Sequence, residues 1–330
     1  MKKVLGIGNA LVDILVKLDD DKILADFNLE KGSMTLVDNS KANSVLEAAA
    51  ELEKSKSSGG SVANTIHGLA MLGAPAGYIG KIGDDSYGSF FSSYMQQKSI
   101  DTTLFKGKNE SGKSIVLISE DSERTFATFL GAAIELDKAD LNIDLFKNYD
   151  YFQLEGYLVQ NHDLVREAVK LSKAAQNQVS IDLASFNVVE ENLDFLHEIV
   201  DGYVDVVFAN EEEARAFTGK NDPEEALQAI SKKCKIAIVK IGKEGSLIKE
   251  GDKQYRVPVI KANAVDTTGA GDLYASGFFY GLACGHSLDI CGKIGSITSG
   301  KVVEVVGAKM DDAKWQEVVQ LVKEVEKAAS

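Results

Sequence analysis

Two carboxylates bracket a run of small residues in the segment DTTGAGD, from Asp266 to Asp272. Gly269, Ala270 and Gly271 carry little or no side chain, so their backbone N–H groups can approach an anion closely. The apolar pattern that follows predicts a helix over residues 271–284, whose positive N-terminal end faces the same anion. Asp272 lies in its first turn, where a carboxylate can accept a proton from an attacking hydroxyl. The segment therefore indicates phosphoryl transfer, with residues 269–271 as anion hole and Asp272 as general base.

A purely structural alternative exists for Asp272, because an N-capping aspartate after a glycine-rich loop would explain the same carboxylate without catalysis. A second segment favours the catalytic interpretation. It reads SSGGSVANTIHGLAMLGAPAGYIGKIGDDSYG, opening with Gly59 and Gly60, continuing as an apolar-periodic helix and ending in a strand before Gly83.

Two such segments in this order resemble the two signatures of the ribokinase-like or pfkB family of sugar and nucleoside kinases. The resemblance covers nearly the whole chain. Within the family it is closer to adenosine kinase-like members, through GNALVDI from Gly8, KGSMTLVD from Lys31, SERTFATFLGAA and FANEEEA. It implies that ATP and Mg²⁺ serve the phosphorylation of a hydroxymethyl group on a small-molecule nucleoside or sugar, with adenosine as the leading acceptor.

Two alternatives remain beside adenosine. One is a kinase for a free sugar such as ribose or fructose, or for inosine or guanosine. The other belongs to a different class, a catalytically silent nucleoside-binding sensor on a kinase scaffold. The intact Asp272 and anion hole argue against the sensor.

Polar residues and glycines near the N-terminus are candidates for the acceptor site. Asn9 and Asp13 follow a buried-type strand, and strand ends of an open sheet commonly face the ligand. A carboxylate suits a sugar because it can accept hydrogen bonds from two vicinal hydroxyls. By resemblance Asp13 binds the sugar hydroxyls, and Gly59, Gly60 and Asn64 belong to the same pocket. A turn aspartate and a helix-start glycine pair are the structural alternatives. The segment GIGNA lacks the third glycine of a dinucleotide fingerprint, since position 11 is Leu11.

Donor and metal contacts are carried by the resemblance alone. It implies that Asn210 and Glu213 of the Asn-x-x-Glu motif organise Mg²⁺ with its waters, partly from the second coordination sphere. It implies a nucleotide loop over KIGKEGS, with Lys240 near phosphates where relatives often have threonine, and room for ATP at Gly242 and Gly245. A plain hairpin turn at Lys243 and Glu244 explains these glycines equally well.

Three further contacts follow from the same resemblance. Arg124 aligns with an arginine that reaches donor phosphates, although a solvated arginine paired with Glu123 is the structural alternative. Ser299 is a candidate contact to adenine or ribose, although helix packing is the stronger interpretation there. Backbone oxygens of Asp266 and Thr268 are candidates for a monovalent-cation site, for K⁺ where one is used.

Composition excludes several functional classes. The formal net charge of −14 argues against a general electrostatic attraction to nucleic acid or anionic membranes. The three cysteines form neither a CxxC pair nor an even disulfide framework, and the four histidines lack zinc-like spacing. No run of eighteen apolar residues and no signal-peptide pattern occurs. We expect a cytoplasmic protein, a monomer or a homodimer.

The elements that must position these residues follow an α/β pattern. From residue 150 onward predicted strands and helices alternate, which predicts right-handed βαβ units and a mostly parallel, doubly wound sheet with helices on both faces. A hairpin is predicted over SGKSIVLISEDSERTFATFL, with its turn at residues 120–123. By resemblance the early strands and this hairpin form a small β-sheet lid. We expect one ribokinase-like domain over residues 1–330, with a discontinuous lid at roughly 11–18, 30–39 and 101–130.

Overall fold

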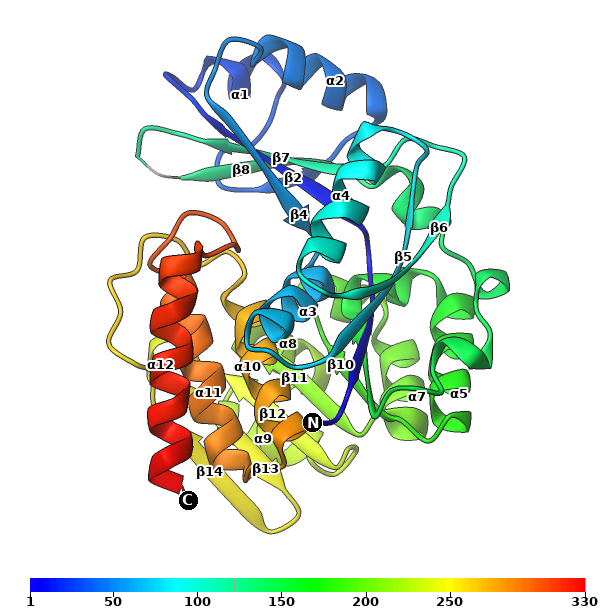
Figure 1. Ribbon diagram of the computed structural model, residues 1–330, viewed down its shortest axis with the longest axis vertical. Coiled ribbons are helices and arrows are strands. Elements are labelled where there is room, and N and C mark those ends of the chain that lie inside the picture. The colour runs from blue at the N-terminus through cyan, green and yellow to red at the C-terminus, as the bar shows by residue number, and fades with distance from the viewer. Residues whose placement is uncertain (122, 330) are drawn as a thin grey trace.

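Two β-sheets organise the chain in the computed structural model, which describes residues 1–121 and 123–329 (Figure 1). The larger sheet has nine strands in the order β14-β13-β12-β11-β10-β9-β1-β5-β6. Its strands are β1 (Val4–Ile7), β5 (Ala76–Ile82), β6 (Asp101–Lys106), β9 (Tyr151–Glu155), β10 (Gln178–Asp182), β11 (Val206–Asn210), β12 (Ile236–Lys240), β13 (Ser246–Glu250) and β14 (Lys253–Val257). The neighbours from β6 to β12 pair in parallel, and β13 and β14 add an antiparallel edge. The predicted mostly parallel sheet is confirmed.

Helices cover both faces of the large sheet because its central strands are apolar on both sides. In β11, Val206 and Phe208 pack into one core cluster, and Val207 and Ala209 pack into the other. The first face is covered by α3 (Ser61–Met71), α10 (Ala270–Cys284), α11 (Leu288–Val302) and α12 (Asp312–Ala329). The second face is covered by α5 (His162–Ala174), α6 (Phe186–Glu191), α7 (Leu193–Tyr203), α8 (Glu211–Thr218) and α9 (Pro223–Ile230). This alternation of side chains produces the doubly wound fold.

The small sheet lies beyond one end of the large one, at the top of Figure 1. Its order is β3-β8-β7-β2-β4, with β2 (Leu11–Lys17), β3 (Met34–Leu36), β4 (Lys54–Gly59), β7 (Gly112–Ile118) and β8 (Arg124–Phe129). The helices α1 (Lys22–Asp26), α2 (Asn39–Ala48) and α4 (Ser86–Gln97) accompany it. β7 and β8 form the predicted antiparallel hairpin, whose turn includes Ser122, outside the described residues.

Two strands differ from the expected limits of the small sheet. Residues 101–106, expected within it, form β6 and pair in parallel with β5 at the edge of the large sheet. This correction has a simple cause, because α4 leads directly back from β5 to β6 as in any βαβ unit. Conversely, β4 completes the small sheet against β2, although its sequence KSKSSG has no apolar alternation.

Short crossings join the two sheets. Residues 8–10 connect β1 to β2, Gly60 connects β4 to α3, and residues 107–111 connect β6 to β7. The acceptor candidates of the sequence analysis therefore lie where the sheets meet. Within the described ranges, no helix combines the length and apolar content needed to traverse a bilayer.

Candidate active site

Asp272 lies in the first turn of α10 and its carboxylate is held by α3. Ser61 Oγ donates to Oδ1 at 2.7 Å and Asn64 Nδ2 donates to Oδ2 at 2.9 Å. Thr65 Oγ1 donates to the backbone oxygen of Asp272 at 3.1 Å. Removal from water raises the pKa of Asp272 to about 6, although the hydrogen bonds from Asn64 and Ser61 act in the opposite direction. The arrangement orients a carboxylate that can take up a proton near neutral pH.

The loop before α10 presents unpaired backbone donors. Gly269 stands at the helix start with φ of 75°, a conformation that favours glycine. Over residues 1–121 and 123–329, no acceptor hydrogen-bonds the amides of Gly269, Gly271 or Asp272, while that of Ala270 bonds the Thr267 oxygen. Three orphan amides at the positive end of a helix form a cradle for an anion. The structure thus leaves two of the three predicted amides free in the described part of the chain, those of Gly269 and Gly271, beside the amide and carboxylate of Asp272.

A cavity of about 120 Å³ opens beside this loop. It is lined by Lys240, Gly242, Gly245, Ser246, Val259, Ala270, Gly271, Tyr274, Ser296 and Ser299. A Cβ added to Gly271 would lie 3.1 Å from Lys240 Nζ, so only a small residue leaves room between the ammonium group and the helix start. The predicted contacts at 240, 242, 245 and 299 are therefore gathered around one cavity. Gly242 and Gly245 flank the turn of the β12–β13 hairpin, so the hairpin interpretation is confirmed as well.

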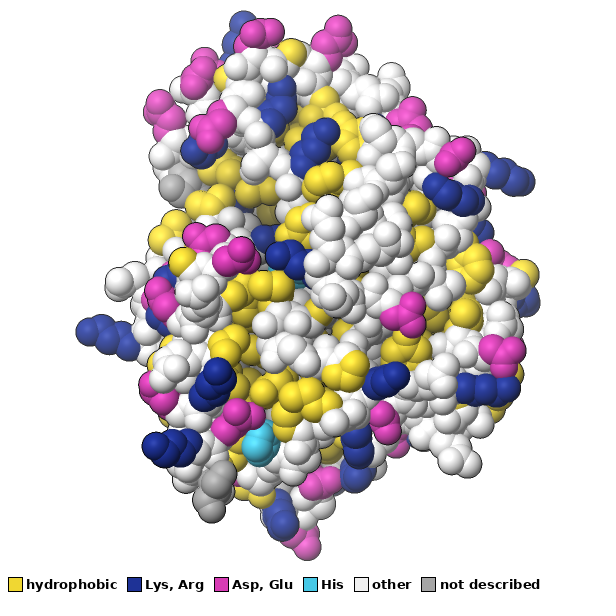
Figure 2. Space-filling model, in the orientation of Figure 1, with side chains coloured by type: hydrophobic (Ala, Val, Ile, Leu, Met, Phe, Trp, Pro, Cys, Tyr) yellow, Lys and Arg dark blue, Asp and Glu magenta, His cyan; other side chains and the backbone are white. Residues whose placement is uncertain are grey.

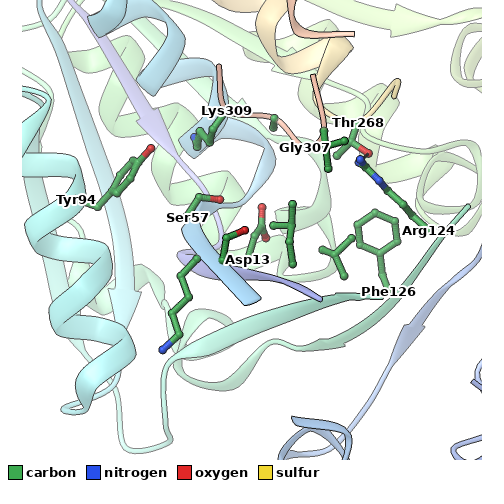
Figure 3. A pocket seen from close by; sticks show the side chains of 14 residues that line it. Asp13, Ser57, Tyr94, Arg124, Phe126, Thr268, Gly307 and Lys309 are labelled. Carbon is green, nitrogen blue, oxygen red and sulfur yellow. Dashed lines mark hydrogen bonds between the residues drawn. The ribbon is translucent and has the colours of Figure 1, made fainter. Parts of the chain in front are cut away.

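A larger cavity of about 240 Å³ lies under the small sheet (Figure 3). It is lined by Asp13, Leu15, Ser55, Lys56, Ser57, Tyr94, Val116, Arg124, Phe126, Thr268, Val306, Gly307, Ala308 and Lys309. Figure 3 shows Tyr94 at one side of the cavity and Arg124 with Phe126 at the other. Figure 2 shows basic and apolar side chains together where the upper and lower parts of the molecule meet. The cavity joins an apolar wall to charged groups.

Asp13 faces this larger cavity from β2. Its burial raises its pKa, the charge of Lys309 lowers it, and the charge of Asp272 raises it again. A Cβ on Gly59 would lie 2.0 Å from Asp13 Oδ1, so the glycine leaves the space that the carboxylate occupies. Gly59 therefore contributes to the site by making room for Asp13.

Asn9 and Gly60 support the crossing between the sheets instead of lining a cavity. Asn9 donates through its backbone N at 3.2 Å and its Nδ2 at 2.7 Å to Glu155 Oε1, and Val62 N donates to Glu155 Oε2 at 3.1 Å. Gly60 has φ of 96°, and a Cβ there would lie 2.2 Å from the Asn9 oxygen. Burial raises the pKa of Glu155 to about 7. Glu155 thus holds the amide nitrogen of Asn9, and the expected contact of Asn9 with the acceptor stays a prediction.

Arg124 begins β8 of the predicted hairpin and its side chain is buried. Its guanidinium bonds the carboxylate of Asp266 and, at 2.9 Å, Thr268 Oγ1. Asp266 further accepts from Gly307 N at 2.7 Å and Thr268 N at 3.0 Å. Arg124 lines the larger cavity and not the one beside Lys240, because β8 runs along the small sheet. It ties the small sheet to the loop that precedes the anion hole, and its contact with donor phosphates stays a prediction.

Polar residues end the neighbouring parallel strands β9 to β12: Glu155, Asp182, Asn210 and Lys240. Lys240 Nζ donates to Asp182 Oδ2 at 2.9 Å. Asn210 and Glu213 form a capping box at α8, with Asn210 donating to both carboxylate oxygens of Glu213. Burial raises the pKa of Glu213, and Lys240 opposes this. These carboxylate and amide oxygens form a donor set of the kind that Mg²⁺ prefers.

Four residues of the site were not predicted from the sequence. Ser61 follows a predicted glycine pair, and Lys309 is a single lysine between Ala308 and Met310 that carries no distinct signal. Glu155 and Asp182 follow apolar strands in the same way as Asn210, so the strand-end rule would have found both. Away from this site, Cys284, His286 and Glu326 offer potential metal ligands within 4.8 Å of one another at the opposite end of α10.

Comparison with known proteins agrees with this geometry. The sequence model of the pfkB family of carbohydrate kinases matches residues 32–315. The 5-dehydro-2-deoxygluconokinase of Bacillus subtilis (strain 168) is 28% identical over 283 residues, covering 81% of this chain and 87% of that protein. The crystal structure of a probable sugar kinase from Rhizobium etli CFN 42 has a TM-score of 0.87 at 32% identity, covering 97% and 98% of the two chains. That of adenosine kinase from Sinorhizobium meliloti has a TM-score of 0.86 at 33% identity, covering 97% and 99%.

Proposed function

Because the chain belongs to the pfkB family of carbohydrate kinases and is a phosphotransferase, we propose that it transfers the γ-phosphoryl group of ATP to a nucleoside hydroxymethyl group, with adenosine favoured. The adenosine kinase from Sinorhizobium meliloti supports the choice of acceptor through its 33% identity over nearly the whole chain. The larger cavity supports it physically, because it combines an apolar wall with the carboxylate of Asp13.

One observation carries the proposal: the segment from Thr268 to Asp272 lies between the two cavities. Thr268 lines the larger cavity, while Ala270 and Gly271 line the smaller one. A donor in the smaller cavity and an acceptor in the larger one would meet at the start of α10, beside Asp272. That is the geometry an in-line transfer between two substrates requires.

The smaller cavity fits a phosphate donor. The orphan amides of residues 269, 271 and 272 can donate to phosphate oxygens, and Lys240 adds a positive charge. We assign Mg²⁺ to the part of the site formed by Asp182, Asn210 and Glu213. Because Asn210 and Glu213 are hydrogen-bonded to each other, they would contact the ion through its bound waters. When bound, Mg²⁺ neutralises phosphate charge that develops during transfer. A requirement for K⁺ at Asp266 and Thr268 stays a prediction.

The larger cavity fits a nucleoside. Val116, Leu15 and Phe126 provide an apolar wall against which a purine can pack. Asp13 provides acceptor oxygens for ribose hydroxyls. An uncharged acceptor also suits a chain with a formal net charge of −14.

The chain's residues divide the reaction among them. Asp272 accepts the proton of the acceptor hydroxyl. The hydroxyl oxygen then bonds to the γ-phosphorus of ATP while the bond between this phosphorus and the leaving ADP breaks. Ser61 and Asn64 hold the carboxylate in place, and the free amides of residues 269, 271 and 272 stabilise the charge of the transferring group. We propose that residues 1–330 form one domain whose small sheet closes as a lid over the substrates. Closure would exclude water from the site and limit ATP hydrolysis.

A second candidate is a kinase for a sugar or sugar acid. The similarity to the 5-dehydro-2-deoxygluconokinase of Bacillus subtilis favours it. So does the larger cavity, because Lys309 and Lys56 among its lining residues are cations that would pair with an acceptor carboxylate. This candidate uses the same Asp272 and the same anion hole.

The deciding experiment measures ADP release with Mg·ATP and a panel of acceptors, namely adenosine, inosine, guanosine, ribose, fructose and 5-dehydro-2-deoxygluconate, plus a blank without acceptor. Asp272→Asn is run in parallel, with Asp289→Asn in the first turn of α11 as control. Turnover with adenosine that collapses only in Asp272→Asn supports the proposal. Preference for a sugar supports the second candidate, and nucleoside binding without turnover supports the sensor.

A further inference from the structure

Lys309 comes from the segment between α11 and α12, and its contacts connect it to the base without touching it. Its Nζ lines the acceptor cavity and donates to Asn64 Oδ1 at 2.8 Å. Asn64 in turn donates through Nδ2 to Asp272 Oδ2 at 2.9 Å. The three side chains form one chain of hydrogen bonds, from an ammonium group through an amide to a carboxylate.

The direction of this chain is fixed by chemistry. An ammonium group has donors only, and an ionised carboxylate has acceptors only. The amide of Asn64 offers one end of each kind, so it can satisfy both neighbours in a single orientation. Asn64 is 6% exposed, so water has little access to either end of the amide.

Without the ammonium group, this series of hydrogen bonds would no longer hold the amide oxygen of Asn64 away from Asp272. The amide could then turn its oxygen toward the carboxylate, which loses a hydrogen bond and gains a repulsion. Both changes disfavour the ionised form of Asp272. Ser61 would remain as a donor to Oδ1.

We infer that Lys309 is a positioning residue, which locks the amide of Asn64 in the orientation that keeps Asp272 ionised and aimed at the acceptor. The inference deepens the proposed function and rests on Asp272 as its base. It assigns a role to a residue that lies far from both sequence signatures and beside the acceptor.

The charged and titratable groups around Asp272 come from several elements. Asp13 belongs to β2, Glu155 to β9, Asp182 to β10, Lys240 to β12, and Lys309 to the segment before α12. The pKa of Lys309 is lowered by burial and raised by Asp13 and Asp272. Because Lys309 also faces Asp13, its loss should change acceptor binding through Asp13 and the base through Asn64, and a test must separate these two effects.

The test is the titration of Asp272 in the whole protein, followed by NMR of ¹³C-labelled aspartate carboxyls, with Asp272→Asn to assign the signal. Lys309→Met should raise the pKa of Asp272 by about one unit, whereas Lys309→Arg, which keeps donors, should shift it less. In an Asn64→Ala background the same change should have little further effect, because Lys309 would act through Asn64. Lys314→Met, with the same loss of charge, is the matched control, since Lys314 pairs with Glu304 and Glu317 outside the cavity.

Kinetics provide a second readout. With the acceptor that the wild type turns over best, Lys309→Met should lower kcat roughly tenfold below neutral pH, and raising the pH should restore it. An unchanged Asp272 pKa in folded Lys309→Met, or an equal shift in the Asn64→Ala background, would overturn the inference. The NMR titration needs no turnover. If the wild type phosphorylates no acceptor, the proposed function fails while the Lys309 effect is still measured.

Discussion

The side chain of Asp272 carries a prediction for the pH dependence of the reaction. Its pKa is raised to about 6, and the active form of a general base is the ionised one. Activity should therefore be full above this pKa and fall as the pH drops through it, to about a tenth of the maximum one unit below. The measurement is kcat against pH with saturating acceptor and Mg·ATP.

The binding of the acceptor should follow a different residue. Burial also raises the pKa of Asp13, which contacts acceptor hydroxyls in the proposed complex. Protonation of Asp13 would thus raise KM for the acceptor, while the pH dependence of kcat follows the ionisation of Asp272.

A kcat that stays constant between pH 5 and 8 would contradict the role of Asp272 as general base.

Gly59 offers a test of Asp13 that leaves the carboxylate in the chain. In Gly59→Ala the new Cβ would lie 2.0 Å from Asp13 Oδ1, so the carboxylate must move. Losing a hydrogen bond to a charged group should raise KM for the acceptor roughly tenfold or more, with a smaller effect on kcat.

The matched control for this variant is Gly202→Ala in α7, where a Cβ would meet nothing within 4 Å. It should leave the kinetics unchanged and add roughly 0.5–1 kcal/mol of stability, as alanine does in a helix. An unaltered KM in Gly59→Ala would remove Asp13 from the acceptor site.

At this scale the sequence predicted the glycines and polar residues that follow a pattern. Asn64 and Lys240 both lie near Asp272 at the start of α10, while their contacts with acceptor and donor stay predictions. Lys309 could not be predicted, because a single lysine between Ala308 and Met310 has no local signal and acquires its role only from the folded chain. The bond of Asn9 to Glu155 could not be predicted for a related reason, since Glu155 is remote in the sequence.

Among the elements, strand β8 is tied to the loop before α10 by the pair of Arg124 and Asp266. The side chains of both are less than a tenth exposed, at 8% and 7%. Arg124→Met would leave a buried carboxylate without its cation, which costs about 3–5 kcal/mol. Urea unfolding should show this loss.

The exposed pair of Arg256 with Glu244 serves as the control for that experiment. Both side chains are more than half exposed, so Arg256→Met should cost less than about 1 kcal/mol. An equal cost for the two variants would mean that the tie does not stabilise the small sheet against the loop.

The helices and strands differ in how well they can be predicted from the sequence. The strands β9 to β12 were predictable because each is an apolar run followed by a polar residue. β4 was not, since the strand KSKSSG owes its conformation to pairing with β2 and not to its own side chains. β6 was assigned to the wrong sheet because the sequence of a strand does not determine which strand it pairs with.

For the whole molecule, closure of the small sheet predicts a change in hydrogen exchange. Adenosine with a non-hydrolysable ATP analogue should slow amide exchange in β2, β7 and β8 and at the crossings 8–10 and 107–111. The central strands β10 and β11 are already buried and should not change. Uniform protection of both sheets, or none in the small one, would argue against a lid.

The place of β1 has a consequence for synthesis on the ribosome. β1 pairs with β5 on one side and with β9 on the other, and β9 begins only at Tyr151. At roughly 5–20 residues per second, the ribosome takes on the order of 10 s to translate the chain from β1 to β9. During that time the strand Val4–Ile7, buried in the finished protein, keeps one open edge. A nascent chain stalled before β9 is therefore a client for chaperones, and the first half of this sequence should not be soluble as a fragment.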